Sequence, residues 1–335
     1  MMIDFAFFEK FLQHLDNATT VLVVSHVGPD GDAVGSLLGM GHMLLSMGKK
    51  PTLALQDADL VYDEFAFLPG VQTIVGTKKV KKKYDLIICL DASSEDRMGT
   101  VYQPKAHANI PLAVIDHHFT NTRFGDVNWV APECAATCQM LVYLADALAV
   151  PLSPEIVTCL LTGIVTDTHC MRTSNTDANV LEAVTRLMNA GGNLSEIVEQ
   201  TLDRRPYSLF RLWGQVMPNI QLEEGVIWVT ISRDQLAAAE ARPDRDARLS
   251  SFLVSAIEAD ISASFIEKVT DEGELAVECS FRAKPGFNVG RVAHNLGGGG
   301  HPQASGCTIV GDLDEITTKV VSALKDAHRE QVSSR

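Results

Sequence analysis

A histidine and two aspartates lie close together near the start of the chain, in the stretch Ser25-His26-Val27-Gly28-Pro29-Asp30-Gly31-Asp32. A short apolar run precedes this stretch, and residues 37–45 follow with apolar side chains at helical spacing, so the pattern predicts a strand, a loop and a helix. Asp30 and Asp32 are two positions apart, which in an extended loop puts their carboxylates on one side. Imidazole and carboxylate groups bind divalent cations. The turn therefore predicts half of a metal site.

Two other interpretations of this turn are open at the level of the local sequence. Asp32 alone could cap the following helix by accepting hydrogen bonds from its first amides. A glycine-rich turn between a strand and a helix is also typical of phosphate binding, although neither G-x-x-x-x-G-K-[ST] nor a full G-x-G-x-x-G is present. The rest of the chain favours the metal site.

Three apolar runs end on residues that bind metals. The runs VLVV, YDLIICL and PLAVI lead to His26, to Asp91 and to Asp116-His117-His118, respectively. Short β-branched runs between helical patterns predict a buried parallel sheet, and ligands of such sheets bind at the carboxyl ends of the strands. A helical stretch over 154–165 leads to Asp167, a further candidate carboxylate.

The candidate ligands together fit the two-metal hydrolysis of phosphate esters. They are His26, Asp30, Asp32, Asp91, His117 and Asp167. Oxygen and imidazole donors suit manganese better than a thiolate-preferring structural zinc site. Four carboxylates offset the charge of two divalent ions and still allow an anionic phosphate to bind. An activated water serves as the nucleophile in this chemistry, so a Ser-His-Asp triad is not required.

Composition limits the classes of partner. The 335 residues are 46% hydrophobic and carry a formal charge of −14, which argues against stable binding to long nucleic acid but leaves room for a small anionic substrate. Residues 1–17 predict an amphipathic helix without a secretory pattern, and no apolar run approaches the ~20 residues that span a bilayer. The seven scattered cysteines lack a C-x-x-C pair, so we expect reduced thiols in a cytoplasmic protein that makes no membrane contact.

The order of patterns along the chain predicts an α/β protein. We expect a catalytic domain over 1–190 with a parallel sheet covered by helices on both faces, a helical linker over 191–213, and a smaller α/β domain over 214–335. In the first domain we expect a strand at 51–56, an irregular stretch at 57–76, and helices at 137–149, 154–165 and 176–202, the last interrupted at 191–193. In the second we expect strands at 225–231, 261–269 and 274–281, and helices at about 248–258 and 313–330.

A tract of four glycines, Gly297–Gly300, precedes His301 and Ser305. Consecutive glycines suggest a backbone that approaches a ligand closely. The alternative is a flexible loop.

Five motifs in this order resemble the DHH phosphoesterase superfamily with its DHH-associated C-terminal domain. They are SHVGPDGDAVGS, LDASS, IDHH, TGIVTDT and GGGGHPQASG, and the resemblance extends over nearly the whole chain. The length and the two-domain layout resemble the stand-alone nanoRNA phosphodiesterases. These oligoribonucleases also remove the 3′-phosphate from 3′-phosphoadenosine 5′-phosphate (pAp). The longer RecJ exonucleases of the superfamily carry a further nucleic-acid-binding domain.

The resemblance implies a role for each candidate residue of the first domain. One manganese ion would be held by His26, Asp30 and Asp91, and the other by Asp32, Asp91, His117 and Asp167, so that Asp91 bridges the two. Mg²⁺ and Co²⁺ are expected substitutes. His118 would contact the scissile phosphate, and Asp116 would orient an imidazole.

For the second domain, the resemblance implies binding of the substrate's other phosphate or its base. The residues concerned are Arg282, Lys284, Gly298, Gly299, Gly300, His301 and Ser305. The chain departs from the family pattern at His169, where glycine is common, and at Ala283, where serine is common. Arg172 is either a substrate contact or a surface charge.

From these residues and this resemblance we expect a manganese-dependent phosphodiesterase that degrades very short RNA to nucleoside 5′-monophosphates and dephosphorylates pAp to AMP. Its partners would be these small substrates, held between the two domains, and a homodimer is compatible with the sequence. One alternative is a phosphodiesterase of cyclic or linear signalling dinucleotides. Another is a non-catalytic nucleotide-binding regulator.

Overall fold

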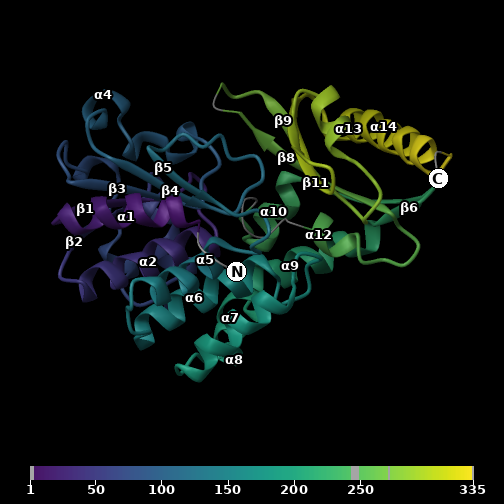
Figure 1. The fold of residues 1–335 in the computed structure, drawn as a ribbon. Coiled ribbons are helices and arrows are strands. Elements are labelled where there is room, and N and C mark those ends of the chain that lie inside the picture. Colours follow the sequence, from purple (N-terminus) through teal and green to yellow (C-terminus); the bar gives the residue numbers. More distant parts are fainter. Residues whose placement is uncertain (1–3, 243–248, 271, 334–335) are drawn as a thin grey trace. The chain divides into compact units, whose positions relative to one another are not determined.

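The chain divides into two compact units, Met1–Arg204 and Arg205–Arg335. The computed structural model shown in Figure 1 describes residues 4–242, 249–270 and 272–333. The boundary between the units falls inside residues 191–213, the stretch that we expected to be a helical linker. Among the described residues, no helix combines the length and the apolar character that crossing a bilayer requires.

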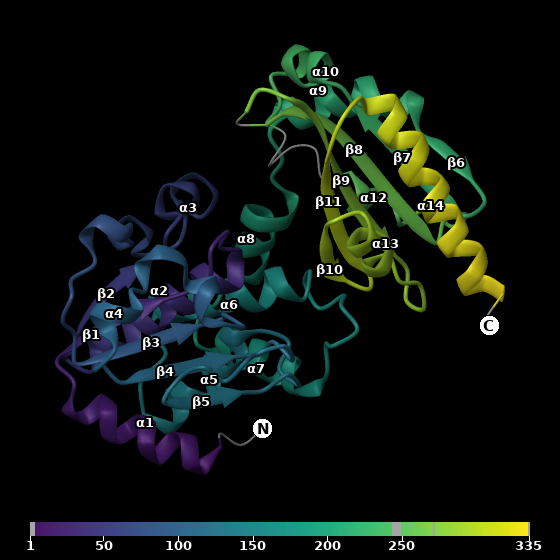
Figure 2. The ribbon, with the colours of Figure 1, turned by 90° about the horizontal axis from the view of Figure 1, so that it is seen from above.

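The first unit contains a five-stranded sheet in which every strand pair is parallel. Its strands are β1 (Thr20–Val24), β2 (Lys50–Ala54), β3 (Leu86–Leu90), β4 (Leu112–Asp116) and β5 (Val127–Val130), in the spatial order β2-β1-β3-β4-β5 (Figure 2). The chain turns from one side of β1 to the other between β2 and β3. In sheets of this kind the ligand crevice lies outside the carboxyl ends of the strands at that switch point.

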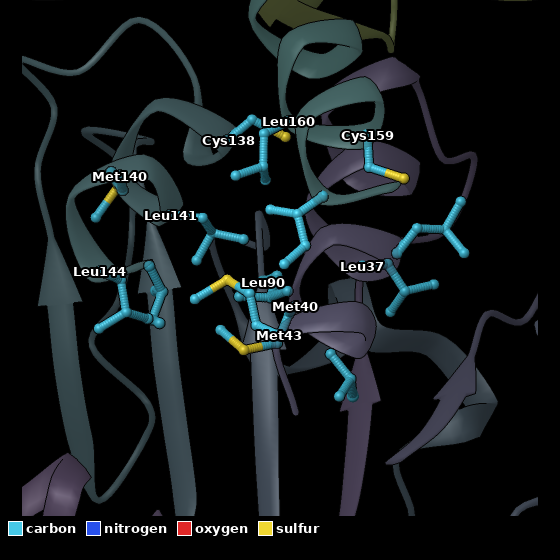
Figure 3. Packing of buried hydrophobic residues seen from close by; sticks show 14 of the residues in the cluster. Leu37, Met40, Met43, Leu90, Cys138, Met140, Leu141, Leu144, Cys159 and Leu160 are labelled. Carbon is cyan, nitrogen blue, oxygen red and sulfur yellow. The ribbon is translucent and has the colours of Figure 1, made fainter. Parts of the chain in front are cut away.

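Helices of the first unit pack on the sheet to form its main core. They are α1 (Phe5–Asn17), α2 (Gly31–Ser46), α3 (Ala58–Glu64), α4 (Pro104–His107), α5 (Thr137–Ala147), α6 (Pro154–Asp167), α7 (Ala178–Asn189) and α8 (Leu194–Val198), with the 3₁₀ turns η1 (Val71–Thr73), η2 (Thr77–Lys79) and η3 (Glu95–Val101) and the π-helical turn η4 (Glu199–Asp203). Figure 3 shows side chains of α2, α5 and α6, such as Met40, Leu141 and Leu160, packed in this core with Leu90 of β3. On the other face of the sheet, Leu22 and Cys89 pack with Met98 of η3.

Most elements predicted for this unit are confirmed within a few residues, but one prediction is wrong and one strand was missed. The stretch 57–76 is not irregular, because α3 buries Ala58 and Val61 against the main core. Strand β5 was not predicted at all. It is a four-residue edge strand that buries only Val127 and Trp129, which is too short for its alternation to stand out.

Asp85 joins the starts of two neighbouring strands. Its Oδ2 accepts hydrogen bonds from Thr19 N (3.0 Å), Thr20 N (2.7 Å) and Thr20 Oγ1 (2.9 Å). These donors stabilise the charged form and hold the pKa of Asp85 below its ordinary value.

We expect Asp85→Asn to lower the free energy of unfolding at neutral pH by about 1 kcal/mol, a modest figure because the carboxylate is exposed. A pKa that is lower in the folded state contributes stability above the unfolded pKa of ~4, and this contribution is lost as the pH falls through the folded pKa. The difference between the wild type and the variant in urea unfolding should therefore stay constant from pH 7 to about pH 5 and shrink below about pH 4. A difference that stays constant at every pH would contradict this assignment.

The second unit is built on a six-stranded mixed sheet. Its strands are β6 (Gln221–Glu223), β7 (Val226–Ile231), β8 (Ile261–Val269), β9 (Leu275–Ala283), β10 (Gly299–His301) and β11 (Ala304–Val310), in the order β10-β11-β9-β8-β7-β6, with only the β7–β8 pair parallel. Its helices are α9 (Tyr207–Val216), α10 (Arg233–Ala239), α12 (Ser250–Leu253), α13 (Gly290–Asn295) and α14 (Leu313–Ser333), with the 3₁₀ turn η5 (Met217–Asn219). Phe265 and Phe281 pack against α13 and α14 on one face, whereas Val229 and Ile266 pack against α9, α10 and α12 on the other.

One prediction for this unit needs correction, and the alternative of a flexible loop at the glycines holds only in part. The helix expected at about 248–258 shrinks to the four residues of α12 in the described part of that range, where residue 248 is not included. The glycine tract is a loop only in its first half: Gly297 and Gly298 precede β10, whereas Gly299 and Gly300 belong to β10, which forms an antiparallel hairpin with β11. A Cβ on Gly298 would lie 2.1 Å from Gly306 O, and one on Gly300, at φ +129°, would lie 2.6 Å from Ala304 O. The close backbone approach that these glycines permit is made by their own hairpin.

Candidate metal centre

The carboxyl ends of three parallel strands bring the predicted ligands together. His26 follows β1, Asp91 follows β3, and His117 follows β4. The start of α2 and the end of α6 add three carboxylates, those of Asp30, Asp32 and Asp167. In three overlapping groups the ligand atoms all lie within 4.8 Å of one another: His26, Asp30 and Asp91; Asp32, His117 and Asp167; Asp91, His117 and His118.

Asp91 lies between two imidazoles and presents a different oxygen to each. Its Oδ2 is 3.5 Å from His26 Nε2, and its Oδ1 is 3.5 Å from His117 Nε2. The backbone of Asp91 has φ +57°, a left-handed conformation that costs a non-glycine residue roughly 1 kcal/mol. Strain of this kind persists where a site requires a particular side-chain direction. At Asp91 the left-handed backbone conformation turns the chain sharply at the end of β3.

The remaining carboxylates surround the same two imidazoles. Asp30 Oδ1 lies 3.8 Å from His26 Nε2, while Asp167 Oδ2 and Asp32 Oδ2 lie 3.4 Å and 4.0 Å from His117 Nε2. Each imidazole therefore faces carboxylates on its Nε2 side. Such pairs of nitrogen and oxygen atoms can converge on a common cation.

Asp32 is held by a helix that begins more than a hundred residues later. Its carboxylate is fully buried and accepts hydrogen bonds from Thr137 N (2.6 Å) and Cys138 N (2.9 Å) at the start of α5, whose dipole favours negative charge there. The residue that caps α2 is Asp30, whose Oδ1 accepts from Asp32 N and Ala33 N. The capping role considered for Asp32 is thus wrong.

Hydrogen bonds orient the histidines. Nδ1 of His26 donates to Val27 O (3.0 Å) and Nδ1 of His117 to Cys134 O (3.3 Å), which leaves Nε2 of each ring for a metal ion. His118 Nδ1 donates to the buried Asp116 (2.7 Å).

The charges of this ligand group favour the binding of positive ions. Burial, and then the charge of Asp91, raise the pKa of Asp32 well above its ordinary value. Burial and the charges of Asp32, Asp30 and Asp91 do the same for the pKa of Asp167. Burial opposes the charge on His26, but Asp30 and Asp91 outweigh it and raise the pKa of that imidazole to about 10. Crowded carboxylates that hold protons this tightly, with hard oxygen and imidazole donors, fit divalent cations.

Sequence reasoning missed several residues that support this site. Thr137 Oγ1 donates to Asp91 Oδ1 (3.1 Å), Asn121 Nδ2 donates to Asp116 Oδ2 (2.6 Å), and Arg97 O accepts from the amide of Val27 (2.8 Å), the residue after His26. Asn121 follows the DHH triplet closely enough to have been suspected. No local signal identifies Thr137 or Arg97.

The candidates in the second unit lie on neighbouring strands. Arg282 of β9 pairs with Ala304 of β11, and Ser305 of β11 pairs with Gly300 of β10. Ser305 Oγ is buried and makes no hydrogen bond within the part of the chain that the structure describes. Gly299 and His301 also belong to β10.

Lys284 follows β9 and is held by the backbone. Its Nζ donates to the carbonyls of Ala256 (2.8 Å) and Ile257 (3.2 Å). These bonds give the ammonium group a structural role that sequence reasoning did not foresee.

Comparison with known proteins decides the family. The DHH family, N-terminal domain, matches residues 20–164, and the DHHA1 domain matches residues 234–326. The chain is 34% identical over 307 residues to the bifunctional oligoribonuclease and PAP phosphatase NrnA of Thermus thermophilus, covering 91% of this chain and 89% of that protein. The chain belongs to the DHH phosphoesterase family. It is therefore a hydrolase of phosphoester bonds, in a family whose members depend on metal ions.

A second relative and a solved structure are also similar to this DHH protein over nearly its whole length. The protein of the same name from Bacillus subtilis is 26% identical over 319 residues, covering 92% of this chain and 95% of that one. The crystal structure of an exopolyphosphatase-related protein from Bacteroides fragilis shares the fold, with a TM-score of 0.87, 23% identity, and coverage of 98% and 97% of the two chains. The predicted fold class is thus confirmed.

The departure at His169 has a backbone counterpart. His169, Cys170 and Met171 have φ values of +46°, +57° and +59°. This is the left-handed region that glycine adopts without strain, which accounts for the glycine that the resemblance leads us to expect directly after Asp167-Thr168.

Proposed function

We propose that this DHH protein is a manganese-dependent phosphodiesterase that degrades very short RNA oligonucleotides to nucleoside 5′-monophosphates and dephosphorylates pAp to AMP. The observation that carries the proposal is Asp91, whose two oxygens face the two imidazoles of adjacent ligand groups. The names of the relatives from Thermus thermophilus and Bacillus subtilis support the choice of substrate.

These ligand groups support a site for two cations. His26, Asp30 and Asp91 would hold one ion, and Asp32, Asp91, His117 and Asp167 would hold the other, so that Asp91 would be shared between them. When bound, the ions supply Lewis acidity for the phosphate and lower the pKa of a water molecule. Manganese accepts both imidazole and carboxylate donors, and Mg²⁺ or Co²⁺ can replace it.

Other residues act on the substrate. Asp116 holds His118 by its Nδ1, so His118 Nε2 is the nitrogen that contacts the scissile phosphate. The hydrogen bond that His118 donates to Asp116 raises the pKa of His118, which favours a cationic imidazolium for binding an anion. In the second unit, Arg282, Lys284, His301, Ser305 and the amides of 299–300 bind the remaining phosphate or the base. The amide of Gly298, which the sequence placed with them, donates to Ala293 O (2.8 Å) instead.

Arg282→Ala should mainly affect substrate binding. We expect KM for pAp to rise roughly tenfold or more, the effect of losing a charge-assisted hydrogen bond, and kcat to change by less than about threefold. The matched control is Arg233→Ala, an exposed arginine at the start of α10, beyond the opposite end of the sheet from Arg282. Equal effects of the two substitutions would argue against a substrate contact at Arg282.

The test of the proposed function is a hydrolysis panel in manganese. It contains pAp, RNA di- to pentanucleotides, a long single strand and cyclic di-AMP, with products separated by chromatography. Fast release of mononucleotides from pAp and the shortest RNAs is expected. Cleavage confined to the cyclic compound would reassign the protein to signalling dinucleotides, and binding without any cleavage would make it a non-catalytic regulator.

A further inference from the structure

A large, exposed aromatic side chain directly follows the metal-centre histidines in the sequence. Phe119 directly follows His118 and is 72% exposed. His118 Nδ1 lies 3.6 Å from Asp91 Oδ1, so the backbone of Phe119 is one residue away from the ligand group. An exposed phenylalanine is costly in water, and one beside a site that handles phosphate esters suggests a ligand with an apolar face.

The backbone that carries Phe119 is fixed. Asn121 N donates to His118 O (3.1 Å), which closes a β-turn with Phe119 as its second residue. Asn121 Nδ2 donates to Ala92 O (3.0 Å) and to Asp116 Oδ2 (2.6 Å), and Thr122 N donates to Ser93 O (2.9 Å). The turn is thus tied to the ends of both β3 and β4. The backbone position from which the ring projects is therefore pre-organised for binding.

We propose that Phe119 is a specificity residue on whose ring the nucleobase of the substrate stacks. The inference rests on the proposed function for the identity of the substrate. In a nucleotide the base is one sugar away from the phosphate, a separation that two adjacent side chains can match. His118 contacts the phosphate, and Phe119 contacts the base attached to it.

Stacking predicts a particular kind of selectivity. Every base has a π face, so a phenyl ring accepts all four bases and has no means of reading their hydrogen-bonding edges. Purines offer more surface than pyrimidines. We therefore expect sequence-tolerant degradation with a lower KM for purine than for pyrimidine nucleotides.

The first experiment measures KM and kcat in manganese for pAp and for its base-free counterpart, ribose 3′,5′-bisphosphate. Phe119→Ala should raise KM for pAp roughly ten- to hundredfold, the effect of losing one base–aromatic stack. It should leave KM for the base-free compound within about twofold. Phe119→Tyr should restore wild-type KM, and Phe119→Leu, which is apolar but lacks a π face, should not. An equal loss with both compounds, or full rescue by leucine, would overturn the inference.

Two measurements separate this inference from the proposed function. Phe5 is 73% exposed at the start of α1, so Phe5→Ala is a matched control that should leave both KM values unchanged. In Phe119→Trp, AMP added with manganese should quench tryptophan fluorescence beyond any quenching in the wild type. Quenching without hydrolysis of any substrate by the wild type would refute the proposed function and support the stacking. Hydrolysis by the wild type with no extra quenching in Phe119→Trp would support the proposed function and refute the stacking.

Discussion

Replacing Asp91 with alanine is expected to abolish hydrolysis. The substitution removes both oxygens that face His26 and His117, and with them the ligand that we propose two cations share. Metal ions contribute several kcal/mol of transition-state stabilisation, so kcat for pAp should fall roughly a thousandfold or more. Manganese binding to the purified protein, measured by equilibrium dialysis, should fall from two ions to one or none.

Two further variants separate loss of chemistry from loss of folding. Asp91→Gly also removes the carboxylate but accommodates φ +57° without strain, so it should fold at least as well as the wild type and be equally inactive. Asp96→Ala removes an exposed carboxylate of η3 and should keep full activity. Near-wild-type turnover by Asp91→Ala would refute the two-metal arrangement.

Gly35→Ala is expected to destabilise the first unit. A Cβ at this position in α2 would lie 2.5 Å from Cys159 O and 3.1 Å from Gly163 N, which are backbone atoms of α6 and cannot rotate away. Alanine gains about 1 kcal/mol of helix propensity over glycine, but forcing two packed helices apart costs about 3 kcal/mol. The cost of the clash therefore outweighs the gain in helix propensity, and the substitution is destabilising. Chemical denaturation should show a net loss of about 2 kcal/mol.

The same substitution should also lower activity, because α2 carries Asp32 and α6 carries Asp167. Gly214→Ala is the matched control. This glycine lies on the exposed side of α9, and nothing lies within 4 Å of its added Cβ. The control should therefore gain up to about 1 kcal/mol in stability. A stable and fully active Gly35→Ala protein would mean that α2 and α6 are not packed this closely.

Local patterns in the sequence predicted much of the first unit correctly. Short β-branched runs separated by amphipathic segments specify a parallel sheet, and the carboxyl ends of parallel strands meet at one edge. For that reason the residues that follow the three runs, His26, Asp91 and His117, could be expected together before any contact was known. The predictions failed where the pattern was short or lay at an edge, as at β5, and where burial of α3 outweighed a turn-rich sequence.

The sequence by itself determined the chemical kinds of ligand and the sheet edge at which they gather, because strand and helix periodicity are local properties. Only the tertiary structure decided the role of each carboxylate. Asp32 is held by amides 105 and 106 residues away, Asp30 takes the cap, and Asp91 turns one oxygen to each imidazole. Likewise, Gly298 and Gly300 make their close backbone contacts with β11 of their own hairpin. These outcomes depend on the packing of α2 against α5 and α6 and on strand pairing, and no local pattern encodes such distances.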